Sequence, residues 1–503
     1  MKRNIVFLII GLVLFTICQA DFNETAVRKI FADTFLSAED IYQQLMMFND
    51  YAKVDKKGEV IADSLEDGSP WYYYIPRGYD PQQPHGMIIW LHGGVGREDY
   101  SEPDEYVYQH PFIELAEEAD MLLLIPMSRK DCMWWERAGE QHVREELLLM
   151  KEKFNIDDDR VYMSGFSDGG SGSFHFSYRL PNDYAGFYPL NGMVSVAAHV
   201  TDKPCFIRNM QNRYLRVVNT DEDALYPAAS TRLTIDLAIS AGADISYHEY
   251  WGVGHNWGYF DEDIPLISKD MARRARDNFQ PKLYWECLNA VEYNRCDWLE
   301  ITGLDTLTAR QEWQQEYNVQ LPETRIAFGF FNDAEFKGDG ILVDKVIEGT
   351  VAEEMGLRGA DIIIAMDEVT TTNIGELNEL KQSKQRGNAV SLLVYREGET
   401  LLLEGVFPEI SYSDALFYNQ PSGAVHGNYS ANTFDLQTSC VQSLIIYINP
   451  EMVNMKIPVQ VIINDKEVFN EIVDYDRFIM QEDVLKNKDR KAVWVNKLEF
   501  EIE

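Results

Sequence analysis

The spacing of apolar and polar positions changes along the chain, and these changes predict where its domains begin and end. Residues 21–65 place apolar side chains at helical intervals, which predicts a helical N-terminal extension. Residues 66–280 contain short apolar runs such as 87–91, which are typical of buried strands, and a segment at 170–180 that can form a helix. We therefore expect a helical extension that lies on a domain of mixed strands and helices.

The pattern after this domain is that of an all-β region. Segments such as 283–287 are short and rich in aromatic and β-branched side chains, and similar segments recur near the C-terminus. The pair Asn464-Asp465 stands between two alternating apolar runs and predicts a β-hairpin. Strands of this length and spacing predict a β-sandwich, divided between residues 281–323 and 409–503.

The two parts of the predicted sandwich are separated by residues 324–408, which have a character of their own. A G-T-x-A sequence begins at Gly349 and is followed by G-L-x-x-A-D-x-I, in which Ala360 replaces a usual glycine. This segment resembles the PDZ domains of bacterial exported proteases. The resemblance implies that a peptide C-terminus adds a strand to the sheet edge and that its carboxylate binds backbone N–H groups of one turn. The residues of that turn are Phe328, Gly329 and Phe330. We expect the PDZ unit to be inserted into the sandwich, and four domains in tandem are the alternative.

The first motif that indicates catalytic activity is a G-x-S-x-G sequence at residues 165–169. It stands between a predicted strand at 159–164 and the predicted helix at 170–180. The two glycines permit a tight turn that lifts the hydroxyl of Ser167 to its tip, and the helix N-terminus favours negative charge developing there. A strand, such a turn and a helix are typical of the nucleophile elbow of α/β-hydrolases, so we predict that Ser167 is a nucleophile.

A second glycine turn follows the predicted strand at 87–91. His92 is followed there by Gly93 and Gly94, and glycines suit a loop whose backbone a substrate carbonyl must approach. In α/β-hydrolases such a loop gives one N–H group to the oxyanion hole, and the residue after the nucleophile gives the other. We therefore expect oxyanion donors in the turn of Gly93 and Gly94 and at Asp168, with His92 bracing the turn.

Two loops after later predicted strands supply an acid and a base. Asp221 and Asp223 are the main candidate acids, and Asp223 is preferred because its place before Pro227 matches the D-x-x-[VY]-P arrangement familiar in these enzymes. His255 lies in a glycine-flanked loop after the last strand of the domain. The chain order Ser167, Asp223, His255 is the order expected of α/β-hydrolases.

Residues 70–280 resemble the secreted α/β-hydrolases grouped with poly(3-hydroxybutyrate) depolymerases, feruloyl and acetylxylan esterases, and predicted peptidases. The matching positions are residues 91–94, residues 159–170, Asp223 with Pro227 and Ser230, and Gly254 with His255. The resemblance implies acyl transfer, in which Ser167 attacks a carbonyl, His255 moves the proton and Asp223 orients the imidazole.

Three functions fit these residues. A carboxylic ester hydrolase is favoured. A serine peptidase of the prolyl-oligopeptidase kind would use the PDZ unit to grip peptide ends, but no region of β-propeller length precedes the hydrolase. A peptide-binding scaffold with a minor hydrolase is disfavoured because no position of the Ser-Asp-His set is missing.

Length and charge exclude several other classes of protein. The 503 residues include 45 Lys and Arg against 82 Asp and Glu, a formal net charge of −37 that is spread along the chain. Such a surface repels nucleic acids and anionic membranes. No H-E-x-x-H and no C-x-x-C sequence occurs, and residues 157–159 predict a polar turn more readily than a calcium site. We therefore expect neither a metal nor a cofactor.

Residues 1–20 predict a secretory signal peptide, because a basic start precedes an apolar stretch and small residues. The mature protein is then expected outside the cytoplasm, either secreted or periplasmic. Acylation at Cys18, as in a bacterial lipoprotein, is the alternative, and the bulky residue before it argues against it. An exported protein permits disulfides, and Cys287 and Cys296 can bridge a predicted hairpin, but buried thiols fit equally well.

Overall fold

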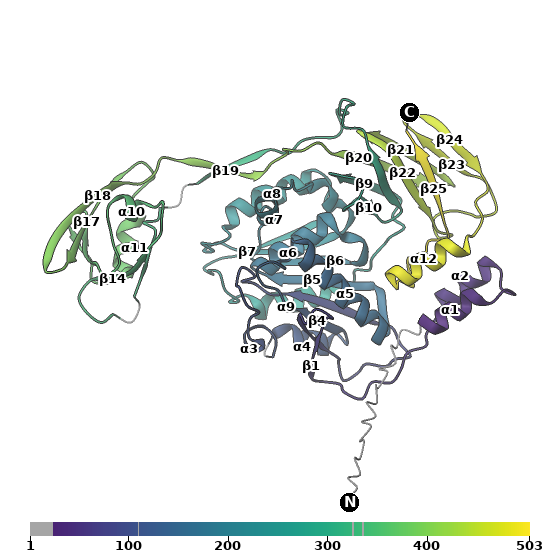
Figure 1. Cartoon of the computed structure of the whole chain (residues 1–503), viewed down its shortest axis with the longest axis horizontal. Helices are drawn as coiled ribbons and strands as arrows, with labels where there is room; N and C mark the ends of the chain where they lie inside the picture. Colours follow the sequence, from purple (N-terminus) through teal and green to yellow (C-terminus); the bar gives the residue numbers. More distant parts are fainter. Residues whose placement is uncertain (1–23, 109, 324–325, 334–335, 503) are drawn as a thin grey trace, which may run out of the picture. The chain divides into compact units, whose positions relative to one another are not determined.

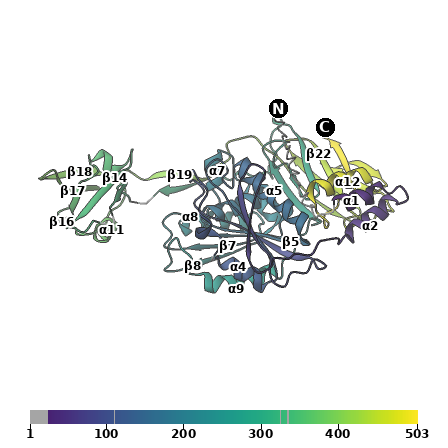
Figure 2. The ribbon, with the colours of Figure 1, turned by 60° about the horizontal axis from the view of Figure 1, so that its bottom comes forward.

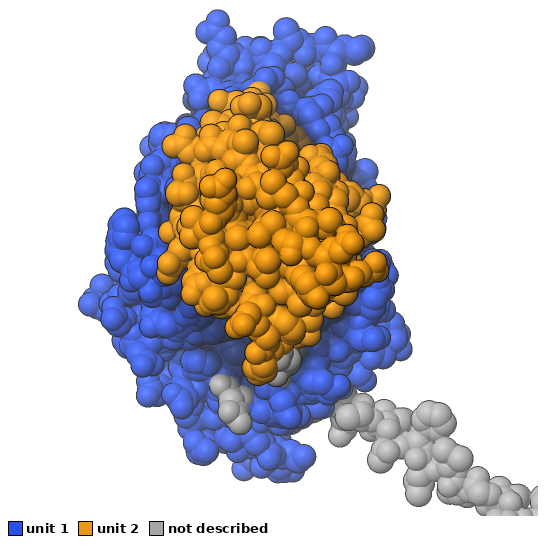
Figure 3. Space-filling view, turned by 90° about the vertical axis from the view of Figure 1, so that its left-hand side faces the viewer, with its two compact units in different colours: residues 1–317, 418–503 blue, residues 318–417 orange. Residues whose placement is uncertain are grey.

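The computed structural model describes residues 24–108, 110–323, 326–333 and 336–502. These residues form two compact units, which Figure 3 colours separately. The first comprises the chain up to residue 317 and from residue 418 onward, and the second comprises residues 318–417. The predicted signal peptide and Cys18 lie outside the described residues. Among the described residues, no helix combines the length and the apolar composition that crossing a bilayer requires.

The largest sheet of the first unit has eight strands in the order β1-β2-β4-β3-β5-β6-β7-β8 (Figure 1). The strands are β1 (Val60–Ser64), β2 (Pro70–Tyr74), β3 (His85–Leu91), β4 (Leu122–Pro126), β5 (Ile156–Phe166), β6 (Gly186–Leu190), β7 (Tyr214–Thr220) and β8 (Ile245–Tyr250). Strand β2 is antiparallel to both of its neighbours, and every pair from β4 to β8 is parallel. All residues of β3 and β4 are buried, as expected for parallel strands that are covered on both faces.

Helices cover both faces of this sheet. They are α3 (Pro103–Tyr106), α4 (Pro111–Glu118), α5 (Arg137–Lys153), α6 (Asp168–Arg179), α7 (Val196–Thr201), α8 (Ala228–Ser240) and α9 (Phe260–Met271). Figure 2 shows α4 and α9 on the side of the sheet away from α5, and their apolar side chains share one core with those of the sheet. A mostly parallel sheet between helices confirms the α/β fold class predicted for this region.

The N-terminal extension contains two helices, α1 (Glu24–Ala32) and α2 (Ala38–Met46), and then loses helical structure. The predicted helical segment is therefore too long, because β1 already belongs to the eight-stranded sheet. The buried side chains of the two helices, such as Phe31 and Ile41, pack into the core of the C-terminal β region and against α12 (Arg477–Asn487). The expectation that these helices lie on the α/β domain is wrong, because their apolar stripe finds its partner surface at the other end of the chain.

The C-terminal β region of the first unit contains two sheets. Their orders are β10-β11-β22-β25 and β24-β23-β21-β20-β9. The strands are β9 (Lys282–Cys287), β10 (Arg295–Cys296), β11 (Leu299–Leu304), β20 (Gly423–Ser430), β21 (Thr433–Ser439), β22 (Val441–Ile448), β23 (Val459–Ile463), β24 (Lys466–Glu471) and β25 (Asn496–Glu501). Each sheet combines strands from before and after the second unit, and one apolar core contains side chains of both sheets.

Two local predictions in this region can be compared with the structure. Asn464 and Asp465 have φ values of 51° and 65° and join β23 to β24 as an antiparallel hairpin, as predicted. Cys287 and Cys296 lie on strands of different sheets, so they do not flank one hairpin, and both are buried free thiols.

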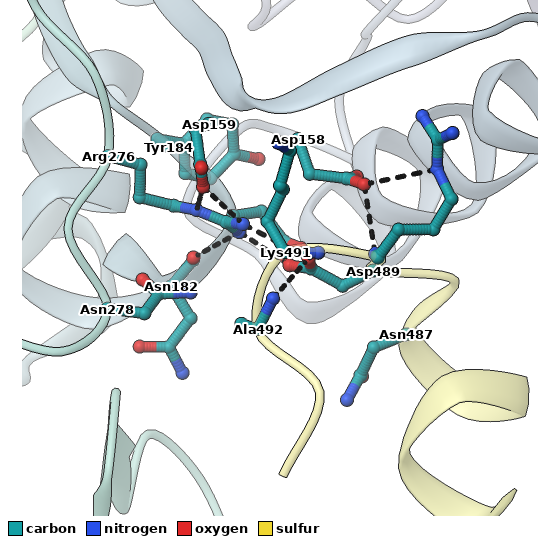
Figure 4. Close-up of polar contacts among 12 residues, drawn as sticks. Asp158, Asp159, Asn182, Tyr184, Arg276, Asn278, Asn487, Asp489, Lys491 and Ala492 are labelled. Carbon is teal, nitrogen blue, oxygen red and sulfur yellow. Dashed lines mark hydrogen bonds and ion pairs between the residues drawn. The ribbon is translucent and has the colours of Figure 1, made fainter. Parts of the chain in front are cut away.

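Buried ion pairs join the α/β domain to the C-terminal segment (Figure 4). Asp158 on β5 pairs with Lys151 at 2.9 Å and accepts the backbone N–H of Arg490 at 3.0 Å. Arg276, whose side chain is inaccessible to solvent, pairs with Asp489 at 2.6 Å. Burial raises the pKa of Asp489, but the charges of Arg276 and Lys151 outweigh this effect and hold that pKa well below its usual range. The acidic run at 157–159 is therefore part of a strand and of this buried contact, and not the polar turn that we expected.

The second unit has its own core and a sheet of the order β13-β14-β15-β17-β18, with β16 beside β15. Its elements are β12 (Val319–Glu323), β13 (Phe330–Asn332), β14 (Ile341–Val346), α10 (Val351–Glu354), β15 (Ile362–Met366), β16 (Val369–Thr370), α11 (Ile374–Gln382), β17 (Ala389–Arg396), β18 (Glu399–Val406) and β19 (Ser411–Leu416). Strands β12 and β19 pair with each other as a separate antiparallel ribbon. The predicted limits of the inserted unit, 324 and 408, fall inside the compact unit of 318–417.

Candidate active site

Ser167 stands at the tip of a sharp turn between β5 and the N-terminus of α6. Its φ of 60° and ψ of −121° lie in a region that non-glycine residues rarely adopt, and such strain is typical of functional positions. A Cβ atom on Gly165 would lie 2.4 Å from the carbonyl group of Gly169, and one on Gly169 would lie 1.8 Å from the carbonyl oxygen of Leu91. The G-x-S-x-G sequence is therefore required by close backbone packing around Ser167.

A continuous chain of hydrogen bonds connects Ser167 to an acid. Nε2 of His255 lies 2.9 Å from Oγ of Ser167, and Nδ1 of His255 lies 2.7 Å from Oδ2 of Asp223. A carboxylate only accepts, so Nδ1 carries the proton and Nε2 is the ring atom that can accept the Ser167 hydroxyl. The three residues follow β5, β7 and β8, whose carboxyl ends share one edge of the sheet, where open α/β sheets bind their ligands.

Asp223 is buried, and both of its carboxylate oxygens accept hydrogen bonds. Its Oδ2 accepts a hydrogen bond from Asn191 at 2.8 Å, and its Oδ1 accepts the backbone N–H groups of Leu225 and Tyr226, each at 2.8 Å. Burial raises the pKa of Asp223, but the hydrogen bonds from His255, Asn191 and the backbone outweigh burial and leave the pKa below its usual value. The carboxylate is therefore ionised at neutral pH and can stabilise a protonated imidazole.

Asp221, the alternative acid, has a different position. Its Oδ1 accepts the backbone N–H of Gly252 at 2.7 Å and so fastens the loop that carries His255. The structure brings Asp223, and not Asp221, to the imidazole of His255.

The glycine turn after β3 lies directly beside Ser167. A Cβ atom on Gly93 would lie 2.9 Å from Cβ of Ser167, and Gly94 has a φ of 69°. Nε2 of His92 accepts the backbone N–H of Ser128 at 2.9 Å, so the proton of the neutral ring is on Nδ1, which lies 2.7 Å from the carbonyl oxygen of Gly93. His92 is fully buried and braces the turn through its ring, as the sequence analysis expects.

Asp168 contributes its side chain as well as its backbone. It is the first residue of α6, where unpaired N–H groups and the helix dipole favour negative charge. Its Oδ2 accepts the backbone N–H of Val95 at 3.1 Å, and its Oδ1 accepts the phenol of Tyr226 at 2.7 Å. The carboxylate of Asp168 therefore links the glycine turn to the loop of Asp223.

Several site residues were missed by the sequence analysis. Asn191, which binds Asp223, follows β6 in a region without a motif. Phe166 and Trp257 stack at 4.4 Å, and Phe166 supports the ring of His255 at 4.9 Å. Of these residues, only Tyr226 could have been found from the sequence, because it occupies the aromatic position of the D-x-x-[VY]-P arrangement.

The predicted peptide site of the second unit lies at one edge of its sheet. Phe330 begins β13, which pairs with β14 on one side, and no other strand of the described residues pairs with its second side. Phe328 is buried in the core of the unit, and its carbonyl oxygen accepts the N–H of Ala352. Gly329 lies between the two, and its carbonyl oxygen accepts the N–H of Ile347. The three predicted residues thus form one turn that leads into an edge strand.

The described residues contain no group of three or more His, Cys, Asp and Glu side chains placed to hold a metal ion.

Comparisons with known proteins identify part of the chain. Residues 319–404 match the family model of the PDZ domain, so the chain carries a PDZ domain, as the resemblance implied. A bifunctional acetylxylan esterase/xylanase from Neocallimastix patriciarum is 27% identical over 140 residues, which are 27% of this chain and 20% of that protein. A serine protease from Bos taurus is 36% identical over 108 residues, which are 22% of this chain and 19% of that protein. The chain spans about a fifth of the length of these curated relatives.

Solved structures include esterases with remote similarity. A thermostable esterase is 16% identical with a TM-score of 0.36, and the match covers 43% of this chain and 63% of that chain. A ferulic acid esterase is 14% identical with a TM-score of 0.36, and the match covers 43% of this chain and 98% of that chain.

Proposed function

We propose that the chain is a serine hydrolase that cleaves carboxylic esters. The observation that carries this proposal is the hydrogen-bonded series Asp223, His255 and Ser167, with Ser167 held at a positive φ in front of a helix N-terminus. A hydroxyl, a neutral imidazole and a buried carboxylate in this order are the parts that activate a serine nucleophile.

The reaction follows from the protons that these groups hold. Oγ of Ser167 attacks the ester carbonyl while Nε2 of His255 takes its proton, and Asp223 stabilises the imidazolium that forms. His255 then gives the proton to the leaving alcohol, which leaves an acyl group on Ser167. In the second half, His255 takes a proton from water, the hydroxide attacks the acyl carbon, and Ser167 recovers its proton as the acid departs.

The oxyanion of each tetrahedral intermediate needs donors that are already in place. We assign this role to the backbone N–H of Asp168 and to the turn of Gly93 and Gly94, which lies beside Ser167. Removing one such donor typically costs roughly 10²- to 10³-fold in kcat. The carboxylate of Asp168 and the ring of His92 fix the position of that turn.

The choice of an ester over a peptide bond is supported by a relative that is named for an acetylxylan esterase activity. A serine peptidase is the second candidate, and the observation in its favour is the PDZ domain, a peptide-binding fold. The purified full chain should therefore be tested on p-nitrophenyl acetate and on a chromogenic peptide, with Ser167→Ala as the control. Ester hydrolysis that disappears in Ser167→Ala supports the proposal. Peptide cleavage as fast as ester cleavage favours the peptidase, and ester hydrolysis that survives in Ser167→Ala would refute the nucleophile.

We further propose that the PDZ domain binds the C-terminus of a peptide or protein along β13, with the carboxylate at the turn of Phe328, Gly329 and Phe330. The open edge of β13 supports this assignment.

We also infer that the two C-terminal sheets form a β-sandwich and that the protein is exported through its N-terminal signal sequence. N-terminal sequencing of protein recovered outside the cytoplasm tests the last point.

A further inference from the structure

A cavity of about 260 Å3 lies at the junction of the α/β domain and the C-terminal β region. Its wall includes residues of α5, β10 and α12, and none of its lining residues belongs to the candidate active site. The volume is below the roughly 300–1,000 Å3 of sites for drug-sized ligands, so the cavity suits a smaller molecule. Figure 4 shows part of its wall, where Asn182, Asn278 and Asn487 lie around the pair of Arg276 and Asp489.

Four cationic side chains line this cavity, and none of them forms an ion pair with a carboxylate among the described residues. Arg144 of α5 donates to the side-chain oxygen of Asn487 at 2.8 Å. Arg295 of β10 stacks its guanidinium 3.6 Å from the ring centre of Tyr447 and donates through Nε to a backbone oxygen. Lys486 of α12 is the third cation, and the fourth is the buried Arg179 of α6, which donates to the backbone oxygen of Pro204 at 2.8 Å. Most of their N–H groups form no hydrogen bond within the described residues.

The four carboxylates of the wall do not balance these four cations, because three of them already face other cations and only Glu300 has neutral partners alone. Asp489 is bound by Arg276 at 2.6 Å, and Asp297 is bound by Arg213 at 2.5 Å. The other two acids of the wall also have contacts within the protein. Glu300 accepts the hydroxyl of Tyr447 at 2.6 Å, and Asp183 faces Lys151 at 3.5 Å.

We propose that this cavity binds a small molecule that carries a carboxylate or phosphate group. A guanidinium presents two parallel N–H groups that match a pair of anionic oxygens, and it does so more readily than an ammonium. Like charges that face one cavity repel each other, and an anion between them removes that repulsion. The arrangement stands out in a chain whose 82 acidic residues far outnumber its 45 basic ones.

The rest of the wall suits the polar remainder of such a ligand. Asn278 is 6% exposed, and its Oδ1 accepts from Arg213, which leaves its amide N–H₂ for the cavity. Asn294 and Asn487 also line the cavity, but their amide N–H₂ groups already donate to Glu300 and Asp483, and the ring of Trp494 forms part of the wall. Amides beside an aromatic ring can bind hydroxyl groups and an apolar ring face together.

Isothermal titration calorimetry of the full chain tests this inference with inorganic phosphate and glucuronate, and with glucose as the neutral probe. We expect one site per chain for at least one anion, no binding of glucose, and weaker binding at high salt. Arg144→Gln and Arg295→Gln should each weaken binding about tenfold or more. Arg273→Gln changes an exposed arginine of the same unit outside the cavity and should leave binding unchanged.

The two anions distinguish the source of the charge. Binding of phosphate alone assigns a phosphate-bearing ligand, and binding of glucuronate alone assigns a carboxylate-bearing one. Absence of binding by both anions at millimolar concentration overturns the inference, and so does equal weakening in Arg144→Gln and Arg273→Gln. Arg144 is exposed, so its replacement is expected to fold normally even if Arg295→Gln does not. The assay measures binding only, so its result is independent of whether Ser167 hydrolyses esters.

Discussion

The phenol of Tyr226 donates a hydrogen bond to the carboxylate of Asp168 across 2.7 Å, and this bond ties two loops of the site together. The second oxygen of Asp168 accepts the N–H of Val95, next to the turn of Gly93 and Gly94, and the N–H of Tyr226 binds Asp223. Burial and the neighbouring Asp168 raise the pKa of the Tyr226 phenol, so it remains a proton donor at all physiological pH values. Tyr226 and Asp168 therefore position Asp223 and the turn of Gly93 and Gly94 relative to each other.

Tyr226→Phe should lower kcat for p-nitrophenyl acetate about tenfold and change KM little, because a hydrogen bond to a charged group is lost where the turn proposed to bind the oxyanion is held. The split between kcat and KM is the informative readout, since a purely structural role would lower thermal stability without this kinetic effect. Tyr74→Phe removes a comparable bond, from a phenol to Glu117, on β2, away from Ser167, and is the matched control. Equal kcat values for the two variants would contradict the positioning role.

The two candidate acids make a sharp comparison. Asp223→Asn should reduce kcat/KM by roughly 10³- to 10⁴-fold, because an amide in place of the carboxylate leaves His255 in the wrong tautomer. Asp221→Asn retains an oxygen that can accept from Gly252 and should cost less than about tenfold. Circular dichroism of both variants controls for folding. A larger loss in Asp221→Asn would show that the acid has been assigned to the wrong residue.

Asp483 on α12 is expected to weaken the fold at neutral pH. Burial raises its pKa to about 6 from the value of 3.8 for an exposed aspartate, although the charge of Arg295 acts in the opposite direction. Between these two pH values the folded state binds more protons than the unfolded state. The free energy of unfolding therefore falls as pH rises from about 4 to about 6 and then loses its dependence on this group.

Asp483→Asn should remove this penalty, because an amide carries no charge and its one oxygen can still accept the N–H₂ of Asn487, although the weak contact of 3.5 Å between Oδ2 and the N–H of Trp494 is lost. The expected gain at pH 7.5 is about 3 kcal/mol as an upper value, and it should vanish near pH 4. Urea unfolding at both pH values measures it. Asp474→Asn, at an exposed position nearby, should show no such difference. A destabilised Asp483→Asn at pH 7.5 would mean that the carboxylate is held by a favourable charge pair.

The sequence predicted the parts of the site that local geometry dictates. The glycines around Ser167 are demanded by backbone contacts within a few residues or with one neighbouring strand, so they appear as a motif. The chain order of Ser167, Asp223 and His255 follows from the order in which β5, β7 and β8 occur along the chain, and it could also be predicted from the sequence. The hydrogen bond between Tyr226 and Asp168 could not be predicted, because it joins residues 58 positions apart and both residue types are common at protein surfaces.

Long-range packing explains the remaining errors. The apolar stripe of α2 shows that one face is buried but carries no information about which surface covers it, and the covering surface comes from α12 and the C-terminal strands. Similarly, three consecutive aspartates predict a solvated turn. Only the structure shows that Lys151 and the backbone N–H of Arg490 contact Asp158. Lys151 is close to Asp158 in the sequence, but Arg276 and Arg490 come from distant parts of the chain, so no local pattern predicted the buried charge network.

The last prediction concerns the unit of residues 318–417. Strands β12 and β19 pair with Val319 opposite Leu416, so the two points where the chain enters and leaves this unit lie close together. Replacing residues 318–417 by a short Gly/Ser linker should therefore leave the first unit folded, because both of its C-terminal sheets are built from strands outside the deleted segment. The shortened protein should hydrolyse p-nitrophenyl acetate at a rate close to that of the full chain, with the activity still abolished by Ser167→Ala. Binding of a peptide with a free C-terminus, measured by fluorescence anisotropy, should be lost, whereas an amidated peptide should bind neither protein. An insoluble product, or a loss of ester hydrolysis in a folded one, would show that the PDZ unit supports the catalytic domain directly.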